Sequence, residues 1–175
     1  MNWINSNWNW CQVSNINNFF IFIIGCFFRD DFMADKFSKE TRSYIMSRIR
    51  GKDTKPEILV RKYLFARGLR FRKNDKRYPG RPDVVLPKYK TAVFVHGCFW
   101  HLHEGCKYAK MPKSNVEYWE KKLYRNRERD ARNQAELKAM GWTVLTVWEC
   151  ELKKDKREET LEILYDQITS QDGVE

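Results

Sequence analysis

The spacing of apolar residues along this chain predicts its helices first. Apolar and charged positions in a helical pattern predict four helices, over residues 36–50, 54–66, 114–140 and 157–169. Thr54 and Ser114 each precede a Glu by three residues, and these capping boxes predict where the second and third helices begin. Gly68 and Gly141 lie just beyond the predicted ends of the same two helices, where glycine suits a helix stop.

Runs of β-branched and aromatic residues predict four short strands, at residues 69–72, 83–86, 91–95 and 142–148. The run at 91–95 is apolar on both faces, which is typical of a buried central strand. The order is therefore two helices, three strands, a long helix, a strand and a helix. This order predicts a mixed α/β domain with helices packed around one sheet.

The first 32 residues differ from the rest of the chain. They hold three of the seven tryptophans, many asparagines and almost no charge, and they include an apolar run from Phe19 to Phe28. A run of this length is too short to cross a bilayer, which takes about 20 residues. The composition changes at Met33, so we predict a working domain over residues 33–175. Residues 1–32 are then an atypical extension, translated from an upstream segment.

Composition and charge narrow the class of protein. Hydrophobic residues make up 42% and charged residues 32% of the chain, which excludes an intrinsically disordered protein. Lys and Arg exceed Asp and Glu by 33 to 23, a net charge of +10 that favours a polyanionic partner, although it could serve solubility alone. After Met33 three cysteines remain, an odd number that favours metal ligation or free thiols over disulfides. We therefore expect a cytoplasmic, nucleoid-associated protein.

Asp83 is the first candidate for chemistry. It follows Gly80-Arg81-Pro82 and precedes two predicted strands. Because Pro cannot donate to a sheet, it belongs at a strand start, which would place Asp83 at the mouth of the sheet. A carboxylate there could hold Mg²⁺, which can polarise a phosphate for hydrolysis. An ordinary Asp at a turn or strand start is the alternative.

Histidine and cysteine cluster in one short segment. All three histidines of the chain lie between His96 and His103, interleaved with Cys98 and followed by Cys106, while Cys150 ends a later predicted strand. The four residues that suit a closed tetrahedral zinc site, structural rather than catalytic, are Cys98, His103, Cys106 and Cys150. Such a site would join an irregular loop to the last strand. Buried thiols and solvated histidines are the alternative.

His96 and His101 then remain for catalysis. Histidine titrates near neutral pH and is a natural general base. His101 would need a carboxylate to orient it, and Asp130 on the long predicted helix is a candidate. The alternative for Asp130 is a surface charge paired with neighbouring arginines.

Two aromatic pairs accompany the basic residues. Phe99-Trp100 lies inside the polar loop, and Tyr118-Trp119 lies near the start of the long helix. An apolar wedge can enter a base stack, and a mismatched step unstacks more easily than a matched one. Core packing is the alternative, and we expect it for Trp142 and Trp148.

Together these segments resemble a known family. Gly80-Arg81-Pro82-Asp83, His96-Gly97-Cys98-Phe99-Trp100-His101, Glu128-Arg129-Asp130 and Trp148-Glu149-Cys150 are similar, in order and spacing, to motifs of the very short patch repair (Vsr) endonucleases. The resemblance extends from about Met33 to the last predicted helix. It implies a restriction-endonuclease-like mixed sheet flanked by helices, with a structural zinc site. It also implies an enzyme that nicks one DNA strand 5′ of the thymine in a T:G mismatch, which arises when 5-methylcytosine deaminates.

The resemblance further implies roles in the chemistry. Asp83 and the backbone carbonyl of Val95 would bind catalytic Mg²⁺, and His101 would activate water with Asp130 orienting it. His96 would lie near the scissile phosphate. Glu57 matches an active-site acid that holds a water of the metal ion, and it could also close the capping box of Thr54.

DNA contacts and partners are implied in the same way. Phe99, Trp100 and Trp119 match the wedge beside the mismatch, and the segment from Arg42 to Arg50, with Arg48, matches a basic arm that grips DNA. The protein would act as a monomer on double-stranded DNA, with mismatch-repair proteins of the MutL type as expected partners.

Alternatives stay open at two points. The family spacing has one residue where this chain has Glu104-Gly105, so His101 is the alternative zinc ligand unless Gly105 takes up the extra residue in a turn. The function could also be that of a zinc-stabilised module that binds distorted DNA without cutting. A nuclease of the same fold with another target, such as a restriction or homing enzyme, is the third possibility.

Overall fold

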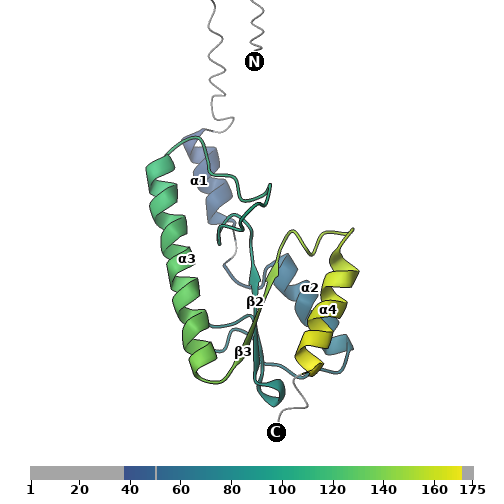
Figure 1. The fold of residues 1–175 in the computed structure, drawn as a ribbon. Coiled ribbons are helices and arrows are strands. Elements are labelled where there is room, and N and C mark those ends of the chain that lie inside the picture. Colours follow the sequence, from purple (N-terminus) through teal and green to yellow (C-terminus); the bar gives the residue numbers. More distant parts are fainter. Residues whose placement is uncertain (1–37, 50, 171–175) are drawn as a thin grey trace, which may run out of the picture. The chain divides into compact units, whose positions relative to one another are not determined.

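A computed structural model describes residues 38–49 and 51–170 (Figure 1). The predicted extension, residues 1–32, and the predicted start at Met33 lie outside this range. The helices and strands in chain order are α1 (Lys39–Ser47), α2 (Lys55–Ala66), β1 (Val84–Leu86), the 3₁₀ turn η1 (Pro87–Tyr89), β2 (Thr91–His96), α3 (Val116–Ala139), β3 (Thr143–Trp148) and α4 (Arg157–Thr169). None of the helices in the described range is both long and apolar enough to cross a membrane.

The sheet has three strands in the order β1-β2-β3. β2 pairs antiparallel with β1 and parallel with β3, and all six of its residues are buried. The prediction of a buried central strand at 91–95 is therefore confirmed. The chain between β2 and β3 contains α3, as a parallel pair requires a crossover connection.

The strand predicted at residues 69–72 is wrong. Only Arg72 pairs with the sheet, through two hydrogen bonds of 2.8 Å with Val85. Leu69 is instead buried in the core beneath α2, and the chain leaves the sheet after Arg72. One residue pair is too little to make a strand.

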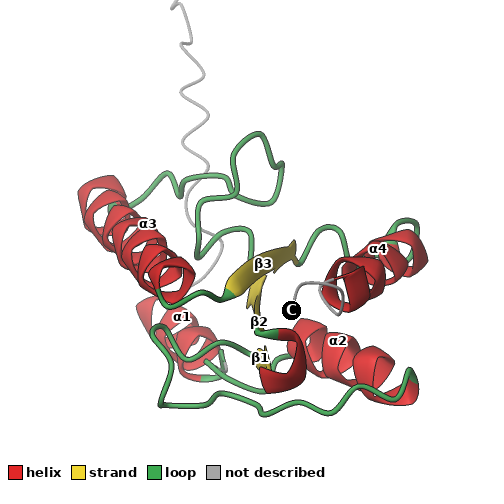
Figure 2. Ribbon diagram, turned by 60° about the horizontal axis from the view of Figure 1, so that its bottom comes forward, coloured by secondary structure: helices red, strands yellow, loops and turns green. Residues whose placement is uncertain are grey.

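Helices cover both faces of the sheet, α3 on one and α2 with α4 on the other (Figures 1 and 2). The alternation of side chains along β2 matches these layers. Val93 and Val95 join the core formed with α2 and α4, while Ala92 and Phe94 pack with Leu137 of α3. The predicted mixed α/β domain is confirmed.

The two capping boxes behave differently. Thr54 is the N-cap of α2, as predicted, and its hydroxyl accepts a hydrogen bond from the Glu57 N–H. The box predicted at Ser114 is wrong, because α3 begins from Asn115 in a left-handed conformation (φ 53°) without a side-chain cap. Asparagine tolerates this conformation better than most residues. Glu117 instead forms an ion pair with Lys121 one turn along the helix.

The strand ends place the candidate site. Because β1 is antiparallel to β2, the beginning of β1 lies at the same edge as the ends of β2 and β3. Asp83 precedes β1, His96 ends β2, and Trp148 ends β3. The residues predicted to carry chemistry therefore meet at one edge of the sheet, where ligands commonly bind in α/β proteins.

Candidate active site and metal-ligand cluster

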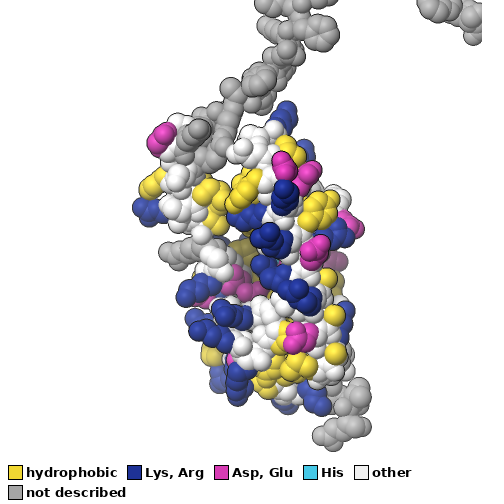
Figure 3. Space-filling view, turned by 90° about the vertical axis from the view of Figure 1, so that its left-hand side faces the viewer, with side chains coloured by type: hydrophobic (Ala, Val, Ile, Leu, Met, Phe, Trp, Pro, Cys, Tyr) yellow, Lys and Arg dark blue, Asp and Glu magenta, His cyan; other side chains and the backbone are white. Residues whose placement is uncertain are grey.

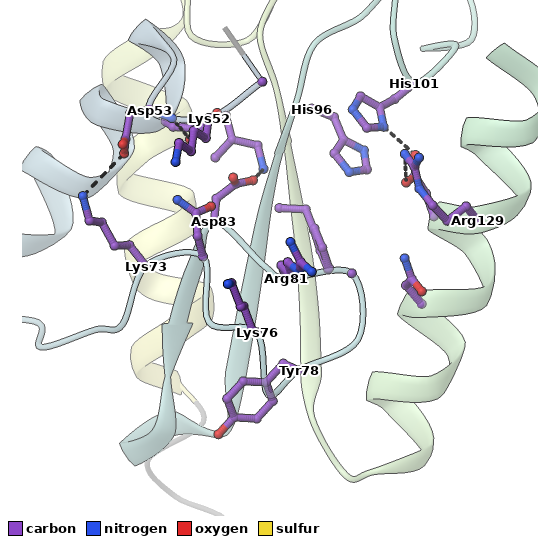
Figure 4. Close-up of a pocket in the computed structure, with 18 residues that line it drawn as sticks. Lys52, Asp53, Lys73, Lys76, Tyr78, Arg81, Asp83, His96, His101 and Arg129 are labelled. Atoms are coloured by element: carbon purple, nitrogen blue, oxygen red, sulfur yellow. Dashed lines mark hydrogen bonds and ion pairs between the residues drawn. The ribbon is translucent and has the colours of Figure 1, made fainter. Parts of the chain in front are cut away.

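A cleft of about 990 Å³ opens at this edge between the sheet and α3 (Figure 4). Five of the predicted site residues line it: Glu57, Asp83, His96, His101 and Asp130. Val95 lines it as well, at the end of the central strand.

Asp83 is held by the sheet itself. Its Oδ2 accepts a 2.7 Å hydrogen bond from the Val95 N–H. Burial raises the pKa of Asp83 to about 6, the Val95 hydrogen bond opposes that rise, and the nearby negative charge of Glu57 adds to it. The N–H and C=O of one residue point to the same side of an antiparallel strand. The Val95 carbonyl therefore faces the same gap as the Asp83 carboxylate.

Glu57 is tied into the start of α2. Its carboxylate accepts hydrogen bonds from the Asp53 N–H at 2.9 Å and the Thr54 hydroxyl at 2.7 Å. The buried Arg61 forms ion pairs with Glu57 at 2.9 Å and with Asp53 at 3.0 Å. Glu57 thus closes the capping box and still lies close enough to Asp83 to raise its pKa.

His96 and His101 stack face to face. Their ring centroids are 3.9 Å apart and the ring planes differ by 6°. His96 is buried, and burial together with the charge of His101 lowers the pKa of His96 to about 4. His96 is therefore neutral at physiological pH and available to donate or accept one hydrogen bond in the cleft.

Asp130 orients His101 from α3. The distance from His101 Nδ1 to Asp130 Oδ2 is 2.5 Å. Burial acts to raise the pKa of Asp130, but the hydrogen bond from His101 and the surrounding positive charge outweigh it, so the net shift is downward. An ionised carboxylate only accepts hydrogen bonds, so the His101 Nδ1 carries the proton. In the neutral ring, Nε2 of His101 is therefore the nitrogen that can accept a proton.

Besides the group of His96, His101 and Asp130, the structure brings a second set of possible metal ligands together. The ligand atoms of Cys98, His103, Cys106 and Cys150 lie within 4.8 Å of one another, and Cys150 Sγ lies 3.4 Å from His103 Nδ1. Zn–S bonds of about 2.3 Å in a tetrahedron put neighbouring sulfurs about 3.8 Å apart. The donor types and their separation therefore fit a tetrahedral cation.

The histidine in this cluster is His103, and His101 lies with Asp130 instead. Gly105 has φ +69°, so the extra residue between His103 and Cys106 is taken up in a left-handed turn. The His103 ring also stacks on Trp148 at 4.0 Å, and that Trp148 meets the His96 ring edge-on at 5.4 Å. Trp148 thus contacts both clusters.

The predicted wedge residues form one half-buried aromatic group. The Phe99, Trp100 and Trp119 rings lie 5.1–6.0 Å apart, in edge or tilted contacts. The Lys122 ammonium sits 5.3–5.4 Å from the two indole rings. The three rings pack on one another and still remain partly exposed. This arrangement is compatible with a DNA-inserting wedge and with a packing role.

Several residues of the site escaped the sequence analysis. Asn126 donates a 3.1 Å hydrogen bond to the Trp100 carbonyl and so joins the loop to α3. Asn126 lies seven residues after Trp119 and four before Asp130. Residues at these intervals share one helix face, which was the available signal. The sequence also does not indicate that Lys52, Lys73 and Lys76 line the cleft.

The predicted DNA arm is only partly described. α1 begins with Ser38 as its N-cap, and Arg48 is exposed beyond its last turn, with its guanidinium 5.0 Å from the Tyr44 ring. The helix is shorter than the predicted 36–50. The side chain of Arg42 and residue 50 lie outside the described part of the chain.

Comparisons with known proteins agree on one family. Residues 34–107 match the family model described as DNA mismatch endonuclease Vsr. The chain is 55% identical over 121 residues to the type II nicking enzyme V.NmeAIP of Neisseria meningitidis serogroup A, covering 69% of this chain and 86% of the relative. It is 49% identical to the type II nicking enzyme V.XorIIP of Xanthomonas oryzae pv. oryzae, covering 69% and 88%. The DNA mismatch endonuclease Vsr of Escherichia coli K12 is 45% identical, covering 69% and 77%.

Proposed function

This chain belongs to the DNA mismatch endonuclease Vsr family and is a DNA endonuclease, and we propose that it nicks one strand 5′ of the thymine in a T:G mismatch. The observation that carries the chemistry is the 2.5 Å pairing of His101 with Asp130 in the cleft that also holds Asp83. General base and candidate metal ligand thus face the same space. The family description supports the mismatch as the target.

In this proposal His101 acts as the general base. Its Nε2 takes a proton from the attacking water while Asp130 stabilises the imidazolium that forms. The water oxygen bonds to phosphorus as one P–O bond of the backbone breaks, and the leaving oxygen takes a proton from solvent water. Neutral His96, stacked on His101, lies where it can hydrogen-bond the scissile phosphate.

The residues that would hold Mg²⁺ are Asp83 and, through its backbone carbonyl, Val95. Two observations support this assignment: the oxygen donors face one gap, and the buried carboxylate has a raised pKa that a bound cation would offset. When bound there, Mg²⁺ would stabilise the charge that develops on the phosphate. Glu57 would hold a water near Asp83.

Zn²⁺ is the cation we propose for the second cluster. A Cys₃His set is typical of structural zinc, and it is closed to substrate because all four positions are taken by protein. Such a site would hold the loop that carries Trp100 and His101. We also infer that the sheet and its helices form a core of the restriction-endonuclease type. In this core Asp83 lies immediately before β1, next to the central strand β2.

Selectivity for a mismatch would come from the aromatic group. Inserting Trp100 and its neighbours beside a base pair requires unstacking, which costs a few kcal/mol in matched DNA and less at a mismatch. The proposed wedge therefore favours T:G over T:A by the difference in unstacking energy between the mismatched and the matched base step.

The test is a nicking assay on duplexes that carry one T:G pair or a T:A control, with and without Mg²⁺. We expect a Mg²⁺-dependent nick 5′ of the mismatched thymine only. Asp83→Asn should abolish the nick and retain binding to the T:G duplex. Lys156→Gln, an exposed change in a turn before α4, is the matched control and should act like the parent protein.

Other outcomes assign another function. Binding to T:G duplexes without a nick in any sequence context would favour a module that recognises distorted DNA. Equal cutting of both duplexes would indicate a nuclease with a different target. Nicking unaffected by Asp83→Asn would reject the assignment of Asp83.

A further inference from the structure

Two hollows meet at the active site. Beside the first cleft lies a second hollow of about 760 Å³, and both are lined by Glu57, Val95 and His101. The two hollows therefore meet at His101, the residue proposed to face the scissile phosphate.

The two hollows differ in charge. The first is lined by five cationic residues: Lys52, Lys73, Lys76, Arg81 and Arg129. Among the described residues, the second is lined by one cation, Lys55, and by an apolar wall that includes Pro56, Ile58 and Trp100. Figure 3 shows the face of α3, with Lys and Arg side chains around a hollow that holds acidic side chains.

Three of the five cations are available to a ligand. Lys73 pairs with Asp53, and Arg129 pairs with Asp130. No side-chain hydrogen bond or ion pair involves Lys52, Lys76 or Arg81 within residues 38–49 and 51–170, while the acids of the same cleft are largely engaged by other groups. Unpaired cations around a cleft attract an anion.

Arg81 stands on a rigid support. Gly80 has φ +70°, and a Cβ there would lie 3.0 Å from the Asn133 Cβ and 3.2 Å from the Phe94 ring. Arg81 itself has φ +51°, its N–H donates to the Tyr78 carbonyl at 3.1 Å, and the next residue, Pro82, is fully buried. A left-handed arginine between two fixed neighbours is a strained arrangement of the kind that collects at functional sites. Figure 4 shows its side chain in the cleft, between Lys76 and His96.

The aromatic group sets the direction of the strand. The proposed nick lies 5′ of the thymine, so the mismatch and the wedge lie on the 3′ side of the scissile phosphate. Trp100 lines the second hollow, which assigns that hollow to the 3′ side. Resting on the proposed function, we propose that the cationic hollow binds the backbone phosphates of the cut strand immediately 5′ of the nick, with Arg81 and Lys76 as the phosphate-binding residues.

The test combines protein variants with neutral phosphates. T:G duplexes carry a single methylphosphonate at the first or second linkage 5′ of the nick, or at the matching linkages 3′ of it. Binding is measured with Ca²⁺ in place of Mg²⁺, and nicking with Mg²⁺. The proteins are the parent chain, Arg81→Gln, Lys76→Gln and the control Lys156→Gln.

We expect the parent and Lys156→Gln to lose about tenfold in affinity on a 5′ methylphosphonate, which is about 1.4 kcal/mol. Arg81→Gln should show a similar loss on the unmodified duplex and little further loss on the 5′ methylphosphonate, because the two changes remove one contact. The slope of log affinity against log salt should fall by about 1 in Arg81→Gln. Circular dichroism of the variants should match the parent.

Equal sensitivity of Arg81→Gln and the parent to the 5′ methylphosphonates would overturn the proposal. Loss of sensitivity to a 3′ linkage instead would reverse the assigned direction. If the parent does not nick T:G duplexes, the proposed function fails. The same methylphosphonate series, placed in whichever duplex the parent cuts, would then still test whether Arg81 contacts a phosphate.

Discussion

Glu57 and Arg61 are only 5% and 7% exposed, yet both carry charge. At the scale of single residues, the buried charges of this site are paired. Arg61 forms ion pairs with Glu57 and Asp53, and Glu57 is close enough to Asp83 to affect its pKa. The negative charge of Glu57 raises the pKa of Asp83, and the positive charge of Arg61 lowers it. The ion pairs at the start of α2 therefore offset part of the negative charge beside the proposed metal ligand.

Replacing Arg61 tests this network. Arg61→Leu leaves Glu57 and Asp53 without their buried partner, so we expect a loss of about 3–5 kcal/mol in the free energy of unfolding. Lys62→Gln, an exposed change at the next position of α2, should stay within about 0.5 kcal/mol. Urea unfolding followed by circular dichroism measures both. A loss below about 1 kcal/mol for Arg61→Leu would mean that the ion pairs contribute little.

The raised pKa of Asp83 predicts that Mg²⁺ binding depends on pH. Burial raises the pKa of Asp83 from 3.8 to about 6, so ionisation lowers the stability of the metal-free protein as pH rises through this window. Mg²⁺ binds the ionised form, so its affinity should fall about tenfold per pH unit below about pH 6. We expect Mg²⁺ to raise the melting temperature at pH 7.5 and much less at pH 5. Asp83→Asn should show no Mg²⁺-dependent shift at either pH, and an equal shift would reject the site.

At the scale of elements, the features set by residues close together in the sequence could be predicted, whereas the contacts made by packing of distant elements could not. The start of α2 follows from Thr54 and Glu57, which lie within one turn. The cysteine and histidine cluster was predictable because three of its ligands lie within nine residues of each other. Two contacts exist only after α3 packs on the sheet: the close approach of Gly80, next to Arg81, to Asn133, and the bond from Asn126 to Trp100 across 26 residues. The left-handed Asn115 likewise has no signal beyond its residue type.

The loop between β2 and α3 should depend on the zinc ion proposed for the four-ligand cluster. Beside the four-ligand cluster, residues 103–113 contact the rest of the fold through the Glu104–Arg127 ion pair, the stacking of His103 on Trp148 and the contact of Tyr108 with Lys153. We expect a zinc chelator to make trypsin cleave after Lys107 and Lys110, with Zn²⁺ but not Mg²⁺ restoring protection. Cys106→Ser should be cleaved without a chelator. Resistance of the chelated protein would show that packing alone orders the loop.

At the scale of the whole described domain, α3 and α4 on opposite faces of the sheet differ in exposed charge. α3 exposes more basic than acidic side chains; the basic ones are Lys121, Arg125, Arg127, Arg129, Arg132 and Lys138, and the acidic ones are Glu117, Glu120, Glu128 and Glu136. α4, on the opposite face, exposes Glu158, Glu159, Glu162 and Asp166. Such a distribution orients an approaching polyanion before contact and raises the association rate at low salt. The net charge of +10 predicted a polyanionic partner, and the fold adds the location of the basic side chains around the cleft, where we propose that DNA binds.

The crossover from β2 to β3 also sets an order of events during folding. The contact of Asp83 with Val95 spans 12 residues, whereas that of His103 with Cys150 spans 47. Closing a longer segment costs more chain entropy, and long-range strand pairing is slow. We expect the β1–β2 hairpin, and with it the acidic residue of the cleft, to form before the last strand brings Cys150 to its three partners. A nascent chain would thus hold the carboxylate proposed for catalysis in place while the four residues proposed to bind zinc are still apart.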